Sequence, residues 1–219
     1  MGAKQAIRHI IENTDFYYSY LVWKYRRAEG NYLRQWSRDS TMHGPSPHAT
    51  KQKNVRTVAK RFGLEAFVET GTYLGEMVQA VKNEFDVLYS IELSPYFYRL
   101  ARRRFRKDEN VHIVEGDSAQ QLGPVVQSLN LPTLFWLDGH YSGGRTGKGE
   151  DDTPITHELR QIVENASVPY AVIVDDARCF VGENGYPTAN QFRHFVQSTL
   201  GDFDMKEVDD CFQITPSHT

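Results

Sequence analysis

Short apolar segments alternate with amphipathic segments through most of this chain. Where apolar residues run together we predict strands, at residues 66–69, 87–91, 111–114, 133–137 and 170–174. Between them, apolar residues recur at helical spacing and predict helices at 74–82, 95–106, 119–129, 154–165 and 189–200. Short apolar strands separated by helices are typical of a parallel sheet that is covered on both faces.

The C-terminal end of the chain departs from this alternation. Residues 203–208 and 211–214 are strand-like and flank Asp209 and Asp210, which predicts an antiparallel hairpin. The expected fold is therefore α/β: a Rossmann-like, doubly wound, mostly parallel seven-stranded sheet closed by this hairpin.

The N-terminal end is expected to form a helical extension, residues 1–49, before a main domain at residues 50–219. Apolar residues at helical spacing predict a helix over 4–27, and glycines and prolines predict a loop over 37–49. A second helix is expected over 50–62. The first helix is rich in aromatic residues. It is interpreted as packing on the sheet, covering an active site or forming a homodimer contact.

The junction between the first strand and the helix after it contains two glycines, Gly71 and Gly75. A strand that enters a helix through a glycine turn is typical of a phosphate- or nucleoside-binding corner in a doubly wound sheet. The third glycine of the dinucleotide fingerprint is missing, which disfavours an NAD-linked oxidoreductase. Glu69, just before the turn, would repel a pyrophosphate and better suits a cationic or hydroxyl-rich ligand.

Acidic residues follow the other strands too. Glu92 lies about 20 residues after Gly71, the separation at which a carboxylate can bind both hydroxyls of a ribose. Further polar residues follow the third, fourth and fifth strands: Glu115, Asp117, Ser118, Asp138, Asp175 and Asp176. A single acidic residue after a strand is typically only the cap of the following helix. Polar residues after all five strands, aligned along one edge of the sheet, are more typical of a ligand site.

Several of these segments together resemble a class I S-adenosylmethionine-dependent methyltransferase, over roughly residues 50–215. They are Glu-Thr-Gly-Thr-Tyr-Leu-Gly (69–75), Ile-Glu-Leu-Ser (91–94), Gly-Asp-Ser (116–118) and the terminal hairpin. Leu-Asp-Gly-His-Tyr (137–141) and Val-Asp-Asp (174–176) resemble the metal-dependent O-methyltransferases of natural-product sugars, the macrocin type, and more distantly the catechol type.

The resemblance implies a role for each matching residue. The methionine part of the cofactor would lie against Glu69, Gly71 and Gly75, the ribose on Glu92, and the adenine at Asp117 and Ser118. Thr72, Leu93 and Asp138 are expected among the further cofactor contacts. A divalent ion, usually magnesium, would be held by Asp138, Asp175 and Asp176.

Elementary electrostatics agrees with the metal assignment. Three convergent aspartates repel one another and stay ionised together only beside a cation. Hard oxygen ligands favour Mg²⁺. A hydroxyl bound to that ion becomes easier to deprotonate and is held in place for methyl transfer.

The segment after the fourth strand holds a further catalytic residue, His140, which we expect to act with Asp138. An imidazole titrates near neutral pH and suits a general base. A metal ligand, a substrate donor and a structural role remain open for His140. The glycine-rich segment 142–152 is interpreted as a lid over the acceptor, the alternative being a surface loop.

Composition excludes several classes of function. A net charge of −3 and a pI near 6.2 give no bulk attraction for nucleic acid. Cys179 and Cys211 lack the spacing of a zinc site or a disulfide framework. Charged residues at positions 4, 8 and 12 argue against a signal peptide, and the apolar stretch 16–23 is too short to cross a bilayer. A cytoplasmic setting is expected.

The sequence therefore predicts an enzyme that uses S-adenosylmethionine and Mg²⁺ to methylate a hydroxyl of a small polyhydroxylated acceptor. Two alternatives remain. One is a metal-independent N- or carboxyl-methyltransferase, in which Asp175 and Asp176 bind no metal and act only as helix caps. The other is a cofactor-binding partner protein without catalysis. Neither nucleic acid nor membrane is expected as a partner.

Overall fold

The computed structural model describes residues 14–38, 44–138 and 155–217. The chain forms two compact units, one of residues 1–43 with 47–49, the other of residues 44–46 with 50–219. None of the described helices is long and apolar enough to cross a membrane.

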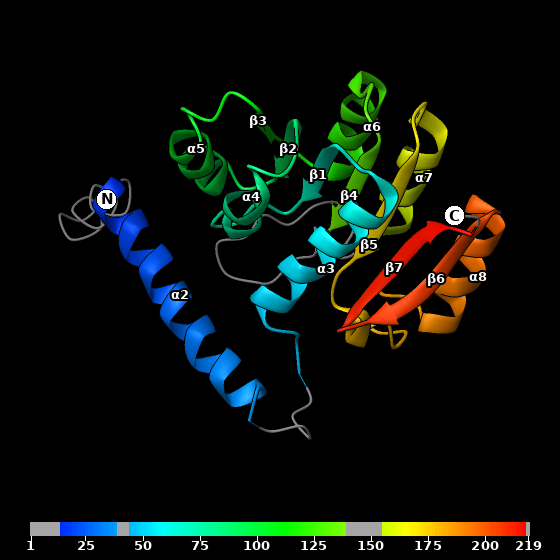
Figure 1. The fold of residues 1–219 in the computed structure, drawn as a ribbon, viewed down its shortest axis with the longest axis horizontal. Coiled ribbons are helices and arrows are strands. Elements are labelled where there is room, and N and C mark those ends of the chain that lie inside the picture. Colours follow the sequence, from blue (N-terminus) through cyan, green and yellow to red (C-terminus); the bar gives the residue numbers. More distant parts are fainter. Residues whose placement is uncertain (1–13, 39–43, 139–154, 218–219) are drawn as a thin grey trace. The chain divides into compact units, whose positions relative to one another are not determined.

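The second unit is built on one seven-stranded sheet with the strand order β3-β2-β1-β4-β5-β7-β6 (Figure 1). The strands are β1 (Ala66–Thr70), β2 (Val87–Glu92), β3 (Val111–Glu115), β4 (Thr133–Leu137), β5 (Tyr170–Val174), β6 (Phe203–Val208) and β7 (Cys211–Pro216). The first five are parallel, and β7 pairs antiparallel with both β5 and β6. The predicted doubly wound sheet with a closing hairpin is confirmed.

Helices cover both faces of the sheet (Figure 1). They are α3 (His48–Phe62), α4 (Glu76–Val81), α5 (Pro95–Arg104), α6 (Ser118–Ser128), α7 (Ile155–Asn165) and α8 (Ala189–Leu200). One buried cluster joins α3, α4 and α5 to one face, and a second joins α6, α7 and α8 to the other. Strands β1, β4 and β5 lie between two apolar layers, which explains their continuous apolar runs.

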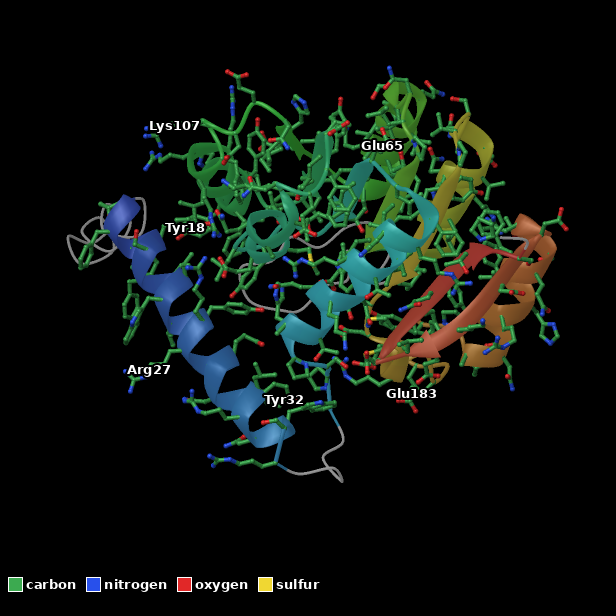
Figure 2. The ribbon with its side chains drawn as sticks, viewed as in Figure 1. Tyr18, Arg27, Tyr32, Glu65, Lys107 and Glu183 are labelled. Carbon is green, nitrogen blue, oxygen red and sulfur yellow. The ribbon has the colours of Figure 1, made fainter. Side chains whose placement is uncertain are left out.

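Parallel pairing aligns the ends of the central strands at one edge. Thr70, the last residue of β1, pairs with Ile91 on one side and with Leu137 on the other. Leu137 in turn pairs with Val174. The segments that follow these residues therefore leave the sheet side by side. In Figure 2, Glu65 precedes β1 and marks the opposite edge of the sheet.

The first unit contains helix α2 (Asp15–Trp36), which Thr14 caps by accepting from the backbone N–H of Tyr17. The prediction of a helix over 4–27 is wrong at its C-terminal end, because the helix continues through Gly30 to Trp36. One glycine inside a helix costs only about 1 kcal/mol. The helix therefore continues past Gly30, where further aromatic residues follow at helical spacing. Residues 4–13 lie outside the described part of the chain. Arg27 and Tyr32, labelled in Figure 2, belong to α2.

Candidate active site at the carboxyl edge of the sheet

The glycine turn after β1 has the backbone that its sequence requires. Gly71 has φ 87° and Gly75 has φ 66°, both in the left-handed region that favours glycine. A Cβ on Gly75 would lie 2.7 Å from the Phe105 ring. Close packing inside the domain therefore also requires this glycine. Between the two glycines, Tyr73 has φ 48° and its ring packs against Phe97.

Glu92, at the end of β2, holds this turn in place. One of its carboxylate oxygens accepts from the backbone N–H of Tyr73 at 2.7 Å, and the other accepts from that of Ser94 at 2.8 Å. Burial raises the pKa of Glu92, and these backbone donors partly offset that effect. Each carboxylate oxygen has a second lone pair, so Glu92 can also accept from a ligand's hydroxyls.

Glu69 is buried beneath the turn. The Ser90 hydroxyl donates to Glu69 at 2.5 Å and lies 2.5 Å from the hydroxyl of Thr72. Burial raises the pKa of Glu69 to about 8, with Asp138 and Glu92 adding to the effect and Ser90 opposing it. Without a nearby cation, Glu69 is therefore largely protonated at neutral pH. A cationic ligand beside it would favour its ionised form.

The polar residues after β3 lie at the start of α6. Asp117 is the N-cap of this helix, since its carboxylate accepts from the backbone N–H of Ala119 at 3.0 Å. Ser118 is buried, whereas Asp117 and Leu93 are half-buried. Asp117 therefore does act as a helix cap. Capping uses one of its carboxylate oxygens and leaves the other for a ligand.

The three aspartates after β4 and β5, here called the acidic triad, come together as the sequence predicts. Asp138, Asp175 and Asp176 each offer a carboxylate oxygen, and these oxygens lie within 4.8 Å of one another. Asp138 is half-buried, and the other two are buried. Burial and the charge of Asp138 raise the pKa of Asp175.

A cation already touches the acidic triad. The ammonium of Lys51, on α3, donates to Asp175 and, at 3.3 Å, to Asp176. Burial lowers the pKa of Lys51, but the charges of the acidic triad outweigh burial and raise it overall. Sequence reasoning missed Lys51. It lies 124 positions from Asp175, on a helix outside the strand-end pattern.

Asp176 is held in a strained conformation. Its φ of 57° and ψ of 46° place it in the left-handed region, which is unfavourable for a residue with a side chain. Arg178 donates to Asp176 at 2.7 Å and also contacts Asp210 in the turn of the terminal hairpin. The hairpin turn therefore braces the loop that presents the acidic triad.

Some of the predicted site lies outside the described residues. His140 and the glycine-rich segment 142–152 fall within residues 139–154, so their roles remain predictions. The described residues form a pocket of about 410 Å³ between the start of α7 and the loop after β5. Its lining includes Thr156, Tyr186 and Gln191. Glu183, labelled in Figure 2, belongs to the same loop.

Solved structures share this arrangement of strands and helices. The O-methyltransferase from Bacillus cereus, solved in complex with SAH, matches with a TM-score of 0.58 and 14% identity, over 85% of this chain and 88% of that chain. The fold is that of the class I methyltransferases. SAH-bound PaMTH1 from Podospora anserina matches with a TM-score of 0.57 and 15% identity, over 99% of this chain and 97% of that chain.

The class I methyltransferase fold recurs in a third match. The O-methyltransferase TomG from Streptomyces achromogenes, involved in tomaymycin synthesis and solved in complex with SAM, has a TM-score of 0.55 and 16% identity, over 76% of this chain and 78% of that chain. No family model and no curated protein matches the sequence. At these identities the likeness establishes the fold, and function is argued from the site.

Proposed function

We propose that this protein is an S-adenosylmethionine-dependent O-methyltransferase that methylates a hydroxyl of a small polyhydroxylated acceptor, such as a sugar or a natural product. One observation carries the proposal. A glycine turn braced by Glu92 and a triad of buried or half-buried aspartates lie on one edge of a class I methyltransferase fold. Ligands of open α/β sheets bind at this edge.

The first half of the site suits a sulfonium nucleoside. Glu92 would accept from both ribose hydroxyls while it keeps its two backbone donors. Glu69, with Gly71 and Thr72, would lie against the methionine part, where a positive charge would favour the ionised Glu69. Asp117 and Ser118 would meet the adenine, with Leu93 alongside.

The acidic triad fits a divalent ion in number, spacing and ligand type. Asp138, Asp175 and Asp176 would hold Mg²⁺ through carboxylate oxygens, which are the ligands this ion prefers. When bound, Mg²⁺ would make an acceptor hydroxyl easier to deprotonate and would fix its direction.

The chain's own residues would orient the reaction. Methyl transfer is an in-line displacement in which the acceptor oxygen attacks the methyl carbon as the sulfur leaves, so alignment supplies much of the rate. The pocket beside Tyr186 and Gln191 would hold the acceptor. His140 would take the hydroxyl proton.

A second function is favoured by Lys51. Its ammonium already neutralises part of the acidic triad. The protein would then be a methyltransferase that needs no metal and acts on nitrogen or a carboxylate.

A chelator separates the two functions. Transfer of labelled methyl from S-adenosylmethionine to a panel of sugars, catechols, amines and carboxylic acids is measured with and without EDTA. We expect methylation of a hydroxylated acceptor that EDTA lowers by at least about a hundredfold and added Mg²⁺ restores. Undiminished turnover in EDTA would show that the reaction needs no metal, and turnover of only the amines or carboxylic acids would favour the second function.

Lys51 and a divalent ion compete for the same carboxylates, so the Lys51→Met variant is expected to bind Mn²⁺ more tightly than the wild type. Loss of one neighbouring positive charge should strengthen binding by about tenfold, or about 1.4 kcal/mol. Titration of Mn²⁺ followed by electron paramagnetic resonance measures the change. Lys53→Met, an exposed change on the same helix, should have no effect. Weaker Mn²⁺ binding by Lys51→Met would mean that Lys51 supports the metal site.

A further inference from the structure

A buried carboxyl group on α7 has no assigned role. Glu158 is 0% exposed and shares one helix face with Ile155, Leu159 and Ile162, all of which pack in the core. Neither carboxyl oxygen makes a hydrogen bond of good geometry within the described part of the chain. A buried polar group without a partner costs about 1–3 kcal/mol. Such groups in native proteins call for an explanation.

The surroundings of Glu158 connect it to the cofactor half of the site. The hydroxyls of Ser118 and Thr70 approach its carboxyl group, and the charges of Asp117 and Asp138 act on it. Ser118 starts α6 after β3, and Thr70 ends β1. Glu158 therefore lies just beneath the edge of the sheet, next to the residues assigned to the adenine.

Glu158 also has acceptor capacity that its neighbour lacks. Asp117 already uses one carboxylate oxygen to cap α6. Neither oxygen of Glu158 makes a hydrogen bond of good geometry in the described part of the chain, and the side chain has three rotatable bonds. It can therefore turn toward a ligand while giving up only its weak contacts with the Ser118 and Thr70 hydroxyls. Burial raises its pKa to about 7, against the effect of the two hydroxyls. In either protonation state one oxygen can accept from an N–H group.

We propose that Glu158 accepts a hydrogen bond from the exocyclic amino group of the cofactor's adenine, and so selects an adenosyl cofactor over other purine nucleosides. This inference rests on the proposed function. An amino group supplies the well-placed donor that Glu158 lacks in the described part of the chain, and a purine without that group leaves the carboxyl with only its contacts to the two hydroxyls. Sites built to hydrogen-bond one ligand group discriminate strongly against analogues that lack it.

Calorimetric titration tests this inference with S-adenosylhomocysteine and its analogue lacking the 6-amino group. For the wild type, the analogue should bind at least about tenfold more weakly. In Glu158→Leu the difference should shrink below about threefold, because the apolar side chain accepts from neither ligand. Glu158→Met should show the same reduced difference, and it replaces the leucine variant in the titration if that variant does not fold. Glu164→Leu, an exposed change on the same helix, should keep the wild-type preference.

The outcomes separate the inference from the function on which it rests. If the wild type binds S-adenosylhomocysteine and the Glu158 variants keep its full preference for the amino group, the inference is overturned and the proposed function stands. If the folded wild type binds neither compound, the proposed function fails and the inference fails with it.

Discussion

Replacing Asp138 with alanine is expected to lower methyl transfer by at least about a thousandfold while the protein stays folded. Asp138 is the half-buried member of the acidic triad, so its carboxylate is the one most open to a ligand. Loss of a charged group that orients or polarises the reacting oxygen typically costs two to three orders of magnitude, and loss of a metal ligand costs more. Turnover with labelled S-adenosylmethionine measures the effect.

Folding should survive this change because the backbone hydrogen bonds of Asp138 remain in place. Its N–H donates to the carbonyl and the hydroxyl of Thr70, and alanine keeps that N–H. Thermal unfolding should therefore shift by only a few degrees. Asp202→Ala, an exposed change before the terminal hairpin, is the matched control and should keep full turnover. An active Asp138→Ala variant would exclude the acidic triad from catalysis.

Glu92→Leu is expected to weaken binding of S-adenosylhomocysteine by at least about a hundredfold. Two losses combine, since leucine neither accepts from ribose hydroxyls nor holds the backbone N–H groups of Tyr73 and Ser94. Hydrogen bonds to a charged group contribute about 1.5–3 kcal/mol each. Two such bonds to a ribose therefore correspond to a factor of one hundred or more. Isothermal titration gives the affinity.

Glu115 provides the control for Glu92. It pairs with Glu92 in register on the neighbouring strand β3, but its side chain is exposed. Glu115→Leu should therefore leave the affinity within about threefold of the wild type. Equal affinities for Glu92→Leu and the wild type would mean that the carboxylate supports only the turn.

The sequence predicted the sheet well because each central strand is buried on both faces. The strands at 133–137 and 170–174 end where the structure ends them, and the turn residues that follow are correctly placed at one edge. Parallel pairing then brings Asp138, Asp175 and Asp176 together without any further assumption. The polar residues that meet at the ends of parallel strands can thus be predicted from one sequence, because the apolar pattern determines the arrangement of the sheet.

Contacts made by helices were harder to predict. Lys51 reaches the acidic triad from α3, and no local pattern indicates which face of a helix meets a sheet edge. Glu158 did leave a signal, because a charged residue interrupts the apolar stripe of α7 at a buried position. Residues 139–154, with His140, lie outside the described structure, so that part of the site remains a prediction.

Whether this edge of the sheet binds an adenosyl cofactor is measured most directly by titrating S-adenosylhomocysteine into folded wild-type protein. We expect one molecule bound per chain with a Kd of about 10 μM or below, equivalent to about −7 kcal/mol. A folded protein that shows no binding heat up to about 1 mM of the nucleoside, where Kd would correspond to about −4 kcal/mol or weaker, would contradict the proposed function.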